Sequence, residues 1–448
     1  MPDQQRHVAI LGAGIAGLSA AYYINEELGP AAHVTLLEAA PQCGGWCQTM
    51  PQQGNSWFEC GPRSFRAANG LETLRLVHLV GLQHSILLAD RRMAMARFVF
   101  LQGKLMKMGP VSAIRQIGVW NLLRETFVPR RSHSEDDESV YAFAERRFGT
   151  GLATLLSAML TGIFAGDAKL LSVRAVFPLL TELEDTYGCV LLGALCKMVA
   201  QAAKAVAARL TGPRRRSLAV AEQWAKEMKR KSLVISALPA YVLADILQAS
   251  TLHTGANGMD PQAIMVQCVN TLRAIPFSSV AVVGFGLQAE QCPWPRSQMG
   301  FGYLIPPSEG QEILGTLMES CTFPDAQPSN VTRVTCMIGK AEHLQGSEAH
   351  LVAVAQKALE RHLGLCITTG QSAVGVAVET LWTAVVVQRR CIPQYTTGHT
   401  KRVAQLQELL HLNAPQLSLA GQSYSGVGVN DAIRVSRELV QLLKKNWA

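Results

Sequence analysis

The residue types with the clearest chemical use in this chain are three glycines and one acidic residue near its start. Gly12, Gly14 and Gly17 have the spacing Gly-x-Gly-x-x-Gly, and Glu38 lies about 20 positions beyond the last of them. Such glycines let the backbone turn tightly and approach a pyrophosphate, and a carboxylate at that distance accepts hydrogen bonds from a ribose. We therefore expect a dinucleotide, NAD or FAD, to bind at Gly12, Ala13, Gly14, Ile15, Ala16, Gly17 and Glu38.

The elements that must position these residues are also present in the sequence. Residues 8–11 form an apolar run that predicts a buried strand, residues 18–28 predict a helix, and residues 34–37 predict a second strand that ends on Glu38. A glycine motif alone is also common in flexible loops. The complete order of strand, turn, helix, strand and acid favours a dinucleotide-binding unit.

A second glycine turn stands near the end of the chain. Residues 417–421 predict a strand, and the turn Val427-Gly428-Val429 precedes a helix that begins near Asn430 and Asp431. Bare N–H groups at a helix N-terminus suit the electron-rich edge of a reduced flavin. Nicotinamide dehydrogenases do not usually need a returning strand and turn at the far end of the chain, so the two ends together favour FAD over NAD.

Two turns that follow Glu38 contribute further candidates. The glycine pair before Trp46 suits close approach of backbone to a flat or charged ligand, although an ordinary turn would have the same sequence. The rigid turn at residues 61–64 contains Arg63, which is either a solvated charge or a neighbour of a flavin or a carboxylate. The candidate cofactor residues in these turns are Trp46, Gly61, Pro62, Arg63 and Ser64.

The middle of the chain predicts a helical region and a second sheet. Residues 97–101 and 104–106 flank Gln102-Gly103 and predict a β-hairpin. The acids at 136–138 are expected in the start of a helix near residue 140, where the helix dipole favours them. Residues 268–337 become rich in strands, and a helix is expected over residues 348–363 with Ser347 as its cap.

The eleven cysteines predict neither a metal site nor a disulfide scaffold. They contain no Cys-x-x-Cys pair and no ligand spacing with histidine, so we expect no metal. Cys43 and Cys47 are interpreted as small buried apolar residues. The residues before the first strand show no leader pattern, so any targeting signal is expected to be internal or non-cleaved. The odd number of cysteines favours a reducing or thiol-tolerant compartment.

Size and charge narrow the class of protein. The chain has 448 residues, 48% of them hydrophobic, and a net charge of +8. Nucleic acid is not an expected partner because the basic residues are scattered without a binding motif. An anionic membrane face and an acidic ligand both fit the charge. The apolar stretch at 190–210 contains Lys197, Lys204 and Arg209, so it is not expected to cross a membrane, although it could lie on one. The basic run at 213–216 is either a solvated face or a contact to anionic lipid heads.

Taken together, the motifs identify a resemblance over nearly the whole chain. The sequence resembles the flavin amine oxidase superfamily and, within it, the branch that oxidises porphyrinogens. The stretches that carry this resemblance are LGAGIAGLSAAYY, GGWCQT, FECGPRSFR, TGIFAGD, FGYLIP, CIPQYTTGH and LAGQSYSGVGVNDAI.

The resemblance implies an activity and the roles of several residues. It implies an oxygen-dependent, six-electron oxidation of protoporphyrinogen IX to protoporphyrin IX in haem biosynthesis, in which each hydride passes from a meso carbon to flavin N5 and hydrogen peroxide is released. By position, Arg97 would pair with a substrate propionate, Phe301 and Leu304 would sandwich one ring, and Met337 and the backbone of Gly166 would line the pocket. Without the family, the apolar residues among these would be interpreted as core and Arg97 as a surface charge.

The resemblance also implies an architecture and partners. The implied fold class is α/β, with a Rossmann-like FAD domain at 1–90, 212–250 and 410–448, a mixed-sheet substrate domain at 91–109 and 251–409, and a helical membrane-docking region at 110–211. The implied location is the outer, intermembrane-space face of the inner mitochondrial membrane, as a peripheral protein. A homodimer and contact with the next enzyme of haem synthesis are implied as well.

The chain departs from the family pattern after Arg230. The family has a Gly-Gly, a Leu-Pro helix and further strands before the equivalent of residues 235–239, whereas here residues 229–231 run directly into the strand at 232–235. The absent segment includes a β segment near the adenine of FAD, and its loss would expose strand edges. The alternatives are therefore another superfamily oxidase acting on amines or polyenes, and an inactive form that acts only by association.

Overall fold

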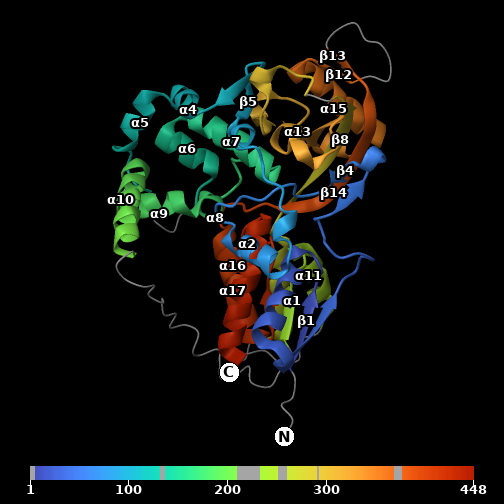
Figure 1. The fold of residues 1–448 in the computed structure, drawn as a ribbon. Helices are drawn as coiled ribbons and strands as arrows, with labels where there is room; N and C mark the ends of the chain where they lie inside the picture. The colour runs from blue at the N-terminus through green and yellow to red at the C-terminus, as the bar shows by residue number, and fades with distance from the viewer. Residues whose placement is uncertain are drawn as a thin grey trace.

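The computed structural model describes residues 6–131, 137–208, 233–250, 260–289, 292–367 and 376–447 (Figure 1). The basic run at 213–216, the junction after Arg230 and Asp136 lie outside these residues.

A four-stranded parallel sheet holds the two ends of the chain together. Its order is β15 (Leu417–Leu419), β7 (Leu233–Ser236), β1 (Arg6–Leu11) and β2 (Ala32–Leu37). Helices α1 (Ile15–Leu28) and α17 (Val429–Trp447) pack against it and against each other, with Ile10, Tyr23 and Ile24 fully buried. The strand–turn–helix–strand unit expected at the N-terminus is confirmed, and a parallel sheet between helices is the α/β arrangement.

A seven-stranded sheet forms the second half of the structure. Its order is β14 (Thr380–Pro393), β8 (Phe277–Gln288), β11 (Val331–Ile338), β10 (Gly315–Leu317), β9 (Gly302–Leu304), β5 (Arg97–Leu101) and β6 (Lys104–Met108). All neighbouring strands are antiparallel except β5 and β9, so the sheet is mixed, as expected. Helix α15 (Glu348–Leu363) buries one side against this sheet, and Ser347 Oγ accepts from the His350 N–H at 3.2 Å, which confirms the expected cap.

Seven helices form a separate region beside this sheet (Figure 1). They are α4 (Pro110–Ile117), α5 (Val119–Glu125), α6 (Val140–Phe148), α7 (Thr150–Phe164), α8 (Val173–Val176), α9 (Pro178–Tyr187) and α10 (Val190–Ala208). Three charged side chains, Glu125, Arg147 and Glu184, are fully buried within it; Arg147 bonds Glu125 at 3.1 Å and Glu184 at 2.6 Å. No described helix is long and apolar enough to cross a bilayer.

The two described acids before α6, Asp137 and Glu138, precede its N-cap as expected and lie outside its first turn. Ser139 Oγ caps the helix by accepting from the Ala142 N–H at 3.1 Å. Asp137 lies outside the helix, where its carboxylate accepts from the Ser172 hydroxyl at 2.8 Å and from the Gly398 N–H at 2.7 Å. Asp137 thus joins the helical region to the distant Gly398, while the Glu138 carboxylate pairs with Arg146 of α6.

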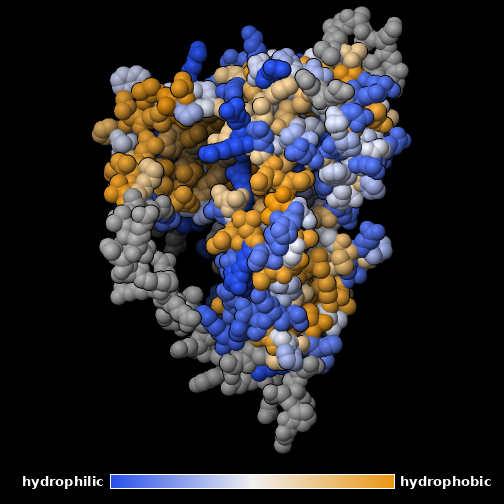
Figure 2. All heavy atoms as spheres, viewed as in Figure 1, coloured by the Kyte–Doolittle hydropathy of each residue, from blue (hydrophilic) through white to orange (hydrophobic). Residues whose placement is uncertain are grey.

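Apolar side chains gather on the surface of the helical region (Figure 2). Among the most exposed are Val111, Trp120 and Phe127, with 81%, 83% and 86% of their surface accessible. Helix α10 adds Leu192, Leu195, Met198 and Val199 to the exposed apolar residues.

The remaining described elements are short or cover the two sheets. They are α2 (Leu71–Leu79), α3 (Arg91–Met95), α11 (Ala240–Gln248), α12 (Pro261–Arg273), α13 (Glu319–Thr322), α14 (Ala341–Leu344), α16 (His399–Asn413), β3 (Thr49–Pro51), β4 (Trp57–Glu59), β12 (Leu365–Ile367) and β13 (Val376–Val378). Helices α11, α12 and α16 share one apolar cluster.

Candidate active site

The first glycine turn joins β1 to α1 and has the geometry that its sequence predicts. Gly12 has φ of 94°, a conformation that favours glycine, and its N–H donates to the Leu37 carbonyl at 2.8 Å. A Cβ on Gly17 would lie 1.9 Å from the Gly12 carbonyl oxygen, so only glycine lets α1 approach the turn this closely. The N-terminus of α1 therefore faces the edge of the sheet where a pyrophosphate would lie.

Glu38 is oriented by this turn. Its Oε2 accepts from the Ala13 N–H at 2.7 Å and its Oε1 accepts from the Ala40 N–H at 2.9 Å. These backbone bonds, first that of Ala40 and then that of Ala13, lower the pKa of the Glu38 carboxyl. The carboxylate is thus held ionised and in place at the end of β2, where its other lone pairs can accept from ribose hydroxyls.

The second glycine pair packs directly on the first turn. The Gly44 N–H donates to the Ala13 carbonyl at 2.8 Å, and a Cβ on Gly45 would lie 3.1 Å from Gly14 Cα. The pair is therefore part of the cradle rather than an ordinary turn. Because this turn carries its neighbours over the cradle instead of into a core, Cys43 and Cys47 are exposed, and the interpretation of both as buried residues was wrong.

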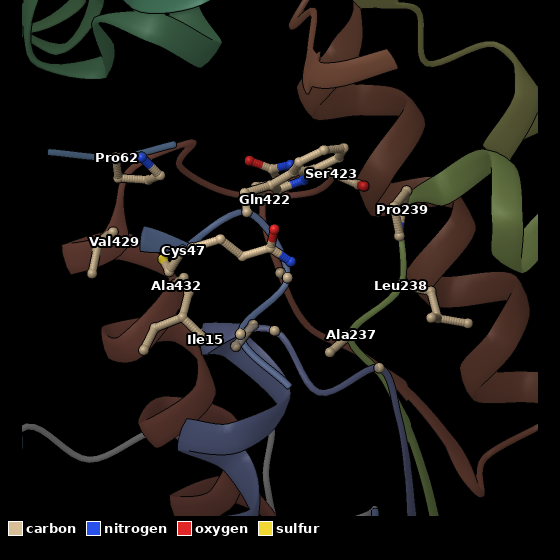
Figure 3. Close-up of a pocket in the computed structure, with 18 of the residues that line it drawn as sticks. Ile15, Cys47, Pro62, Ala237, Leu238, Pro239, Gln422, Ser423, Val429 and Ala432 are labelled. Atoms are coloured by element: carbon tan, nitrogen blue, oxygen red, sulfur yellow. The ribbon is translucent and has the colours of Figure 1, made fainter. Parts of the chain in front are cut away.

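A cavity of about 330 Å³ lies where the two ends of the chain meet (Figure 3). The N-termini of α1 and α17 both border it, and the first N–H groups of a helix have no partner within the helix. Of the expected cofactor residues, the cavity is lined by Gly12, Gly14, Ile15, Ala16, Glu38, Trp46, Pro62, Val427, Gly428 and Val429. Two helix dipoles, exposed amides and one ribose acceptor fit an FAD molecule.

Several lining residues were not among the sequence candidates. Ala237, Leu238 and Pro239 follow β7, and Gln422 and Ser423 follow β15 (Figure 3). Both strands run parallel to β1, so their carboxyl ends meet at the same edge as the Gly12 turn. The position of these segments directly after apolar strands was the signal that could have identified them.

A second cavity, of about 230 Å³, continues from the first. The two share Trp46, Pro62, Gln422 and Val427 in their walls. Apolar side chains from α7, β8 and β14 form much of the second wall, and Arg63 is its one charged lining residue within the described chain. The candidates that line it are Trp46, Gly61, Pro62, Arg63, Met337 and Val427.

Arg63 is a neighbour of a carboxylate, one of the alternatives that the sequence left open. Its Nε lies 3.0 Å from Glu319 Oε1, and the two side chains are 8% and 5% exposed. Arg63 also donates to the carbonyls of Gly61 at 2.9 Å and Glu59 at 2.7 Å. Burial lowers the pKa of Arg63, while the Glu319 charge opposes that shift. The pair fixes the 61–64 turn at the cavity.

The remaining candidates lie near this cavity without lining it. Ala13 and Gly17 belong to the turn itself, and Ser64 lines neither the first nor the second cavity. Leu304 packs on Gly162, which does line the second cavity, because a Cβ on Gly162 would lie 2.4 Å from Leu304 Cδ2. Gly166 packs against the Gln394 side chain, one residue beyond the lining Ala165.

Arg97 and Phe301 lie together at the adjoining strands β5 and β9. The Arg97 guanidinium carbon is 5.2 Å from the centre of the Phe301 ring. Met337, Gly315 and Leu304 face one another across β11, β10 and β9. The sheet thus places Arg97, Leu304 and Met337 on β5, β9 and β11, whereas Arg97 and Phe301 line neither of the two cavities. The lining residues Thr161, Ile163, Gln388 and Cys391 were missed, since no motif distinguishes them.

Comparison with known proteins agrees with this geometry. The family model of flavin containing amine oxidoreductases matches residues 15–442. The chain is 31% identical to human protoporphyrinogen oxidase, over 97% of each protein, and 25% identical to coproporphyrinogen III oxidase of Bacillus subtilis, also over 97% of each. The human alignment spans 489 positions, more than the 448 residues here, so the human protein has residues without a counterpart in this chain.

Solved structures have the same fold. Cyclohexylamine oxidase from Brevibacterium oxydans superposes with a TM-score of 0.59 at 13% identity, covering 98% of this chain and 99% of that one. Reduced UDP-galactopyranose mutase superposes with a TM-score of 0.60 at 13% identity, covering 98% and 93%. With the glycine cradle, Glu38 and the C-terminal turn in place, and the family model matching from α1 to α17, this chain belongs to the flavin containing amine oxidoreductase family and is an FAD-binding oxidase.

Proposed function

We propose that this oxidase converts protoporphyrinogen IX to protoporphyrin IX in haem biosynthesis, with oxygen as the final acceptor. The observation that carries the proposal is the second cavity: it opens from the FAD cavity and its walls are largely apolar, with Arg63 the one charged lining residue in the described chain. A reaction in which the cofactor removes hydride from a large apolar ring needs such a site. The human relative at 31% identity bears the name of this activity.

The residues of this chain then bind and orient the substrate. FAD, when bound, would accept each of the three hydrides that leave meso carbons in the six-electron oxidation. The walls formed by α7, β8 and β14 exclude water around the ring, and Arg63 is engaged by Glu319. Among the described residues no carboxylate, histidine or lysine lines the cavity, and burial raises the pKa of the lining thiols Cys60 and Cys391. The pyrrole N–H protons therefore leave through water rather than through a titratable side chain.

Arg97 would anchor a propionate at the rim. It is exposed, lies over Phe301, and has no carboxylate partner among the described residues. Although the side chain is exposed, its partial desolvation and, second, the nearby positive charge of Arg66 lower the pKa of Arg97. Two neighbouring guanidinium groups suit a dicarboxylate such as a porphyrinogen. Phe301 and Leu304 would hold one ring of the same substrate.

The exposed apolar surface of α4, α5 and α10 supports peripheral docking to a membrane. Contiguous apolar patches of this kind mark membrane or protein contacts. By family resemblance the membrane is the inner mitochondrial membrane, at its outer face, and the partners there are a second copy of the chain and the next enzyme of haem synthesis. An apolar substrate and product make such a location useful.

Anaerobically reduced porphyrinogen tests the proposal. The full chain, reconstituted with FAD, should produce fluorescent porphyrin when oxygen is admitted, with release of peroxide. Coproporphyrinogen III is the matched alternative substrate because two relatives bear its name. Faster turnover of coproporphyrinogen III would reassign the substrate, and turnover of amines alone would favour the amine oxidase alternative. Bound FAD without turnover of any of these would indicate the inactive form.

A further inference from the structure

Two cysteines that are distant in sequence touch beside the second sheet. Cys292 lies in the loop after β8, and Cys321 lies in the short helix α13. Their sulfur atoms are 3.2 Å apart. A disulfide bond is about 2.05 Å long, so the two sulfurs need to approach by only about 1 Å to bond.

We propose that Cys292 and Cys321 form a redox modification site that a peroxide oxidises to a disulfide. The Cys321 thiolate attacks one peroxide oxygen and breaks the O–O bond, which gives a sulfenic acid and one water once the leaving hydroxide takes a proton. Cys292 sulfur then attacks the sulfenic sulfur, and the departing hydroxide takes the Cys292 proton as a second water. The two thiols lose two electrons and the peroxide gains them.

The surroundings of the pair suit this chemistry. Cys292 is partly exposed, so a small oxidant that enters beside it can reach the adjacent Cys321 sulfur, which is 8% exposed and held in the core cluster. A hydrogen bond from Cys292 lowers the pKa of the Cys321 thiol, which favours the nucleophilic form there. Cys292 lies in a loop, so it can make the small approach while α13 stays in place.

A disulfide between Cys292 and Cys321 would affect the second cavity through α13. The same helix carries Glu319, the partner of Arg63 at the second cavity. Ser320, also in α13, accepts from the Arg333 N–H at 2.8 Å on β11. A disulfide would therefore fix the helix that positions the Arg63 anchor. An oxygen-dependent flavin oxidase releases peroxide, which would make the enzyme's own product the oxidant.

Added hydrogen peroxide and peptide mapping test the site without any porphyrinogen. The reduced, FAD-loaded full chain is treated with peroxide under native conditions, alkylated and digested without reductant. We expect a linked peptide pair containing Cys292 and Cys321, lighter by two hydrogens and separated by dithiothreitol. The oxidised protein should also unfold at higher urea than the reduced protein, because the cross-link restricts the unfolded chain.

Matched variants give the controls. Cys292→Ser and Cys321→Ser should each abolish the linked peptide and the urea shift, whereas Cys43→Ser, at an exposed thiol outside both cavities, should leave both unchanged. The proposal is overturned if peroxide oxidises Cys43 while Cys292 and Cys321 remain alkylated, or if either cysteine links preferentially to a different thiol. Neither outcome depends on the identity of the porphyrinogen substrate.

Discussion

Arg63 and Glu319 are 256 positions apart in sequence, yet Arg63 Nε lies 3.0 Å from Glu319 Oε1 in a buried ion pair. The pair joins the Gly-Pro-Arg turn at the FAD cavity to α13 on the seven-stranded sheet. Glu319 also accepts from the Thr335 hydroxyl at 2.6 Å, which ties the same carboxylate to β11. One carboxylate thus connects the Gly-Pro-Arg turn, α13 and β11.

Glu319→Gln should destabilise the protein strongly. The neutral amide would leave the Arg63 charge buried without its counter-ion, and breaking a buried pair in this way costs about 3–5 kcal/mol. Urea unfolding of the FAD-loaded protein measures the loss. Asp245→Asn is the matched control, because the Arg273–Asp245 pair at 2.8 Å is 47% and 66% exposed and should cost less than about 1 kcal/mol. Equal losses in the two variants would contradict the anchoring role.

Glu38→Ala should weaken FAD binding without unfolding the chain. A hydrogen bond to a charged group contributes about 1.5–3 kcal/mol, which corresponds to roughly 10- to 100-fold in affinity. Quenching of flavin fluorescence on titration of the apoprotein measures the dissociation constant. Glu342→Ala, on α14 away from both cavities, is the control and should bind FAD as the parent does. If Glu38→Ala bound FAD with unchanged affinity, Glu38 would not be the acceptor of the ribose hydrogen bonds.

The N-terminal unit was predictable because its signals are local. Two apolar runs and the glycine spacing between them predict β1, α1 and β2. The position of Glu38 at the end of the second run predicts its role as the ribose acceptor. Which distant strands pair with β1 is not local information, so Ala237, Pro239 and Ser423 were missed although they line the FAD cavity. The second cavity was harder still, since neutral residues such as Thr161 and Gln388 become lining residues only through packing.

Two buried histidines should make stability fall as pH decreases below neutrality. Burial lowers the pKa of His362 and of His399 to about 4, so both stay neutral in the folded protein while an unfolded histidine takes up a proton near pH 6.5. Between these values the unfolded state binds more protons, and the free energy of unfolding should decrease by up to about 1.4 kcal/mol per pH unit for each histidine. Urea unfolding at several pH values measures the slope. His362→Asn should reduce it, and an identical slope would contradict the assignment.

Apolar residues of the helical region should govern binding to lipid vesicles. Trp120→Ser combined with Phe127→Ser removes two of the most exposed apolar side chains. Full burial of each side chain in an apolar phase would contribute about 1.5–3 kcal/mol to the free energy of binding. We expect binding to anionic phospholipid vesicles, measured by co-sedimentation, to fall by at least about tenfold. Leu88→Ser is the control, because Leu88 is 85% exposed but lies outside the helical region. A comparable loss in Leu88→Ser would argue against docking through α5.

Arg97→Gln should raise KM for protoporphyrinogen IX while leaving FAD affinity unchanged. The guanidinium has no carboxylate partner among the described side chains, so its removal leaves no buried charge unpaired and takes away only a substrate contact worth about 1.5–3 kcal/mol. KM should therefore rise roughly 10- to 100-fold with kcat nearly constant, the pattern of lost uniform binding. Arg92→Gln, an exposed arginine on the neighbouring α3, should behave as the parent. If KM stays constant while kcat falls, Arg97 acts on the reacting geometry rather than on a propionate.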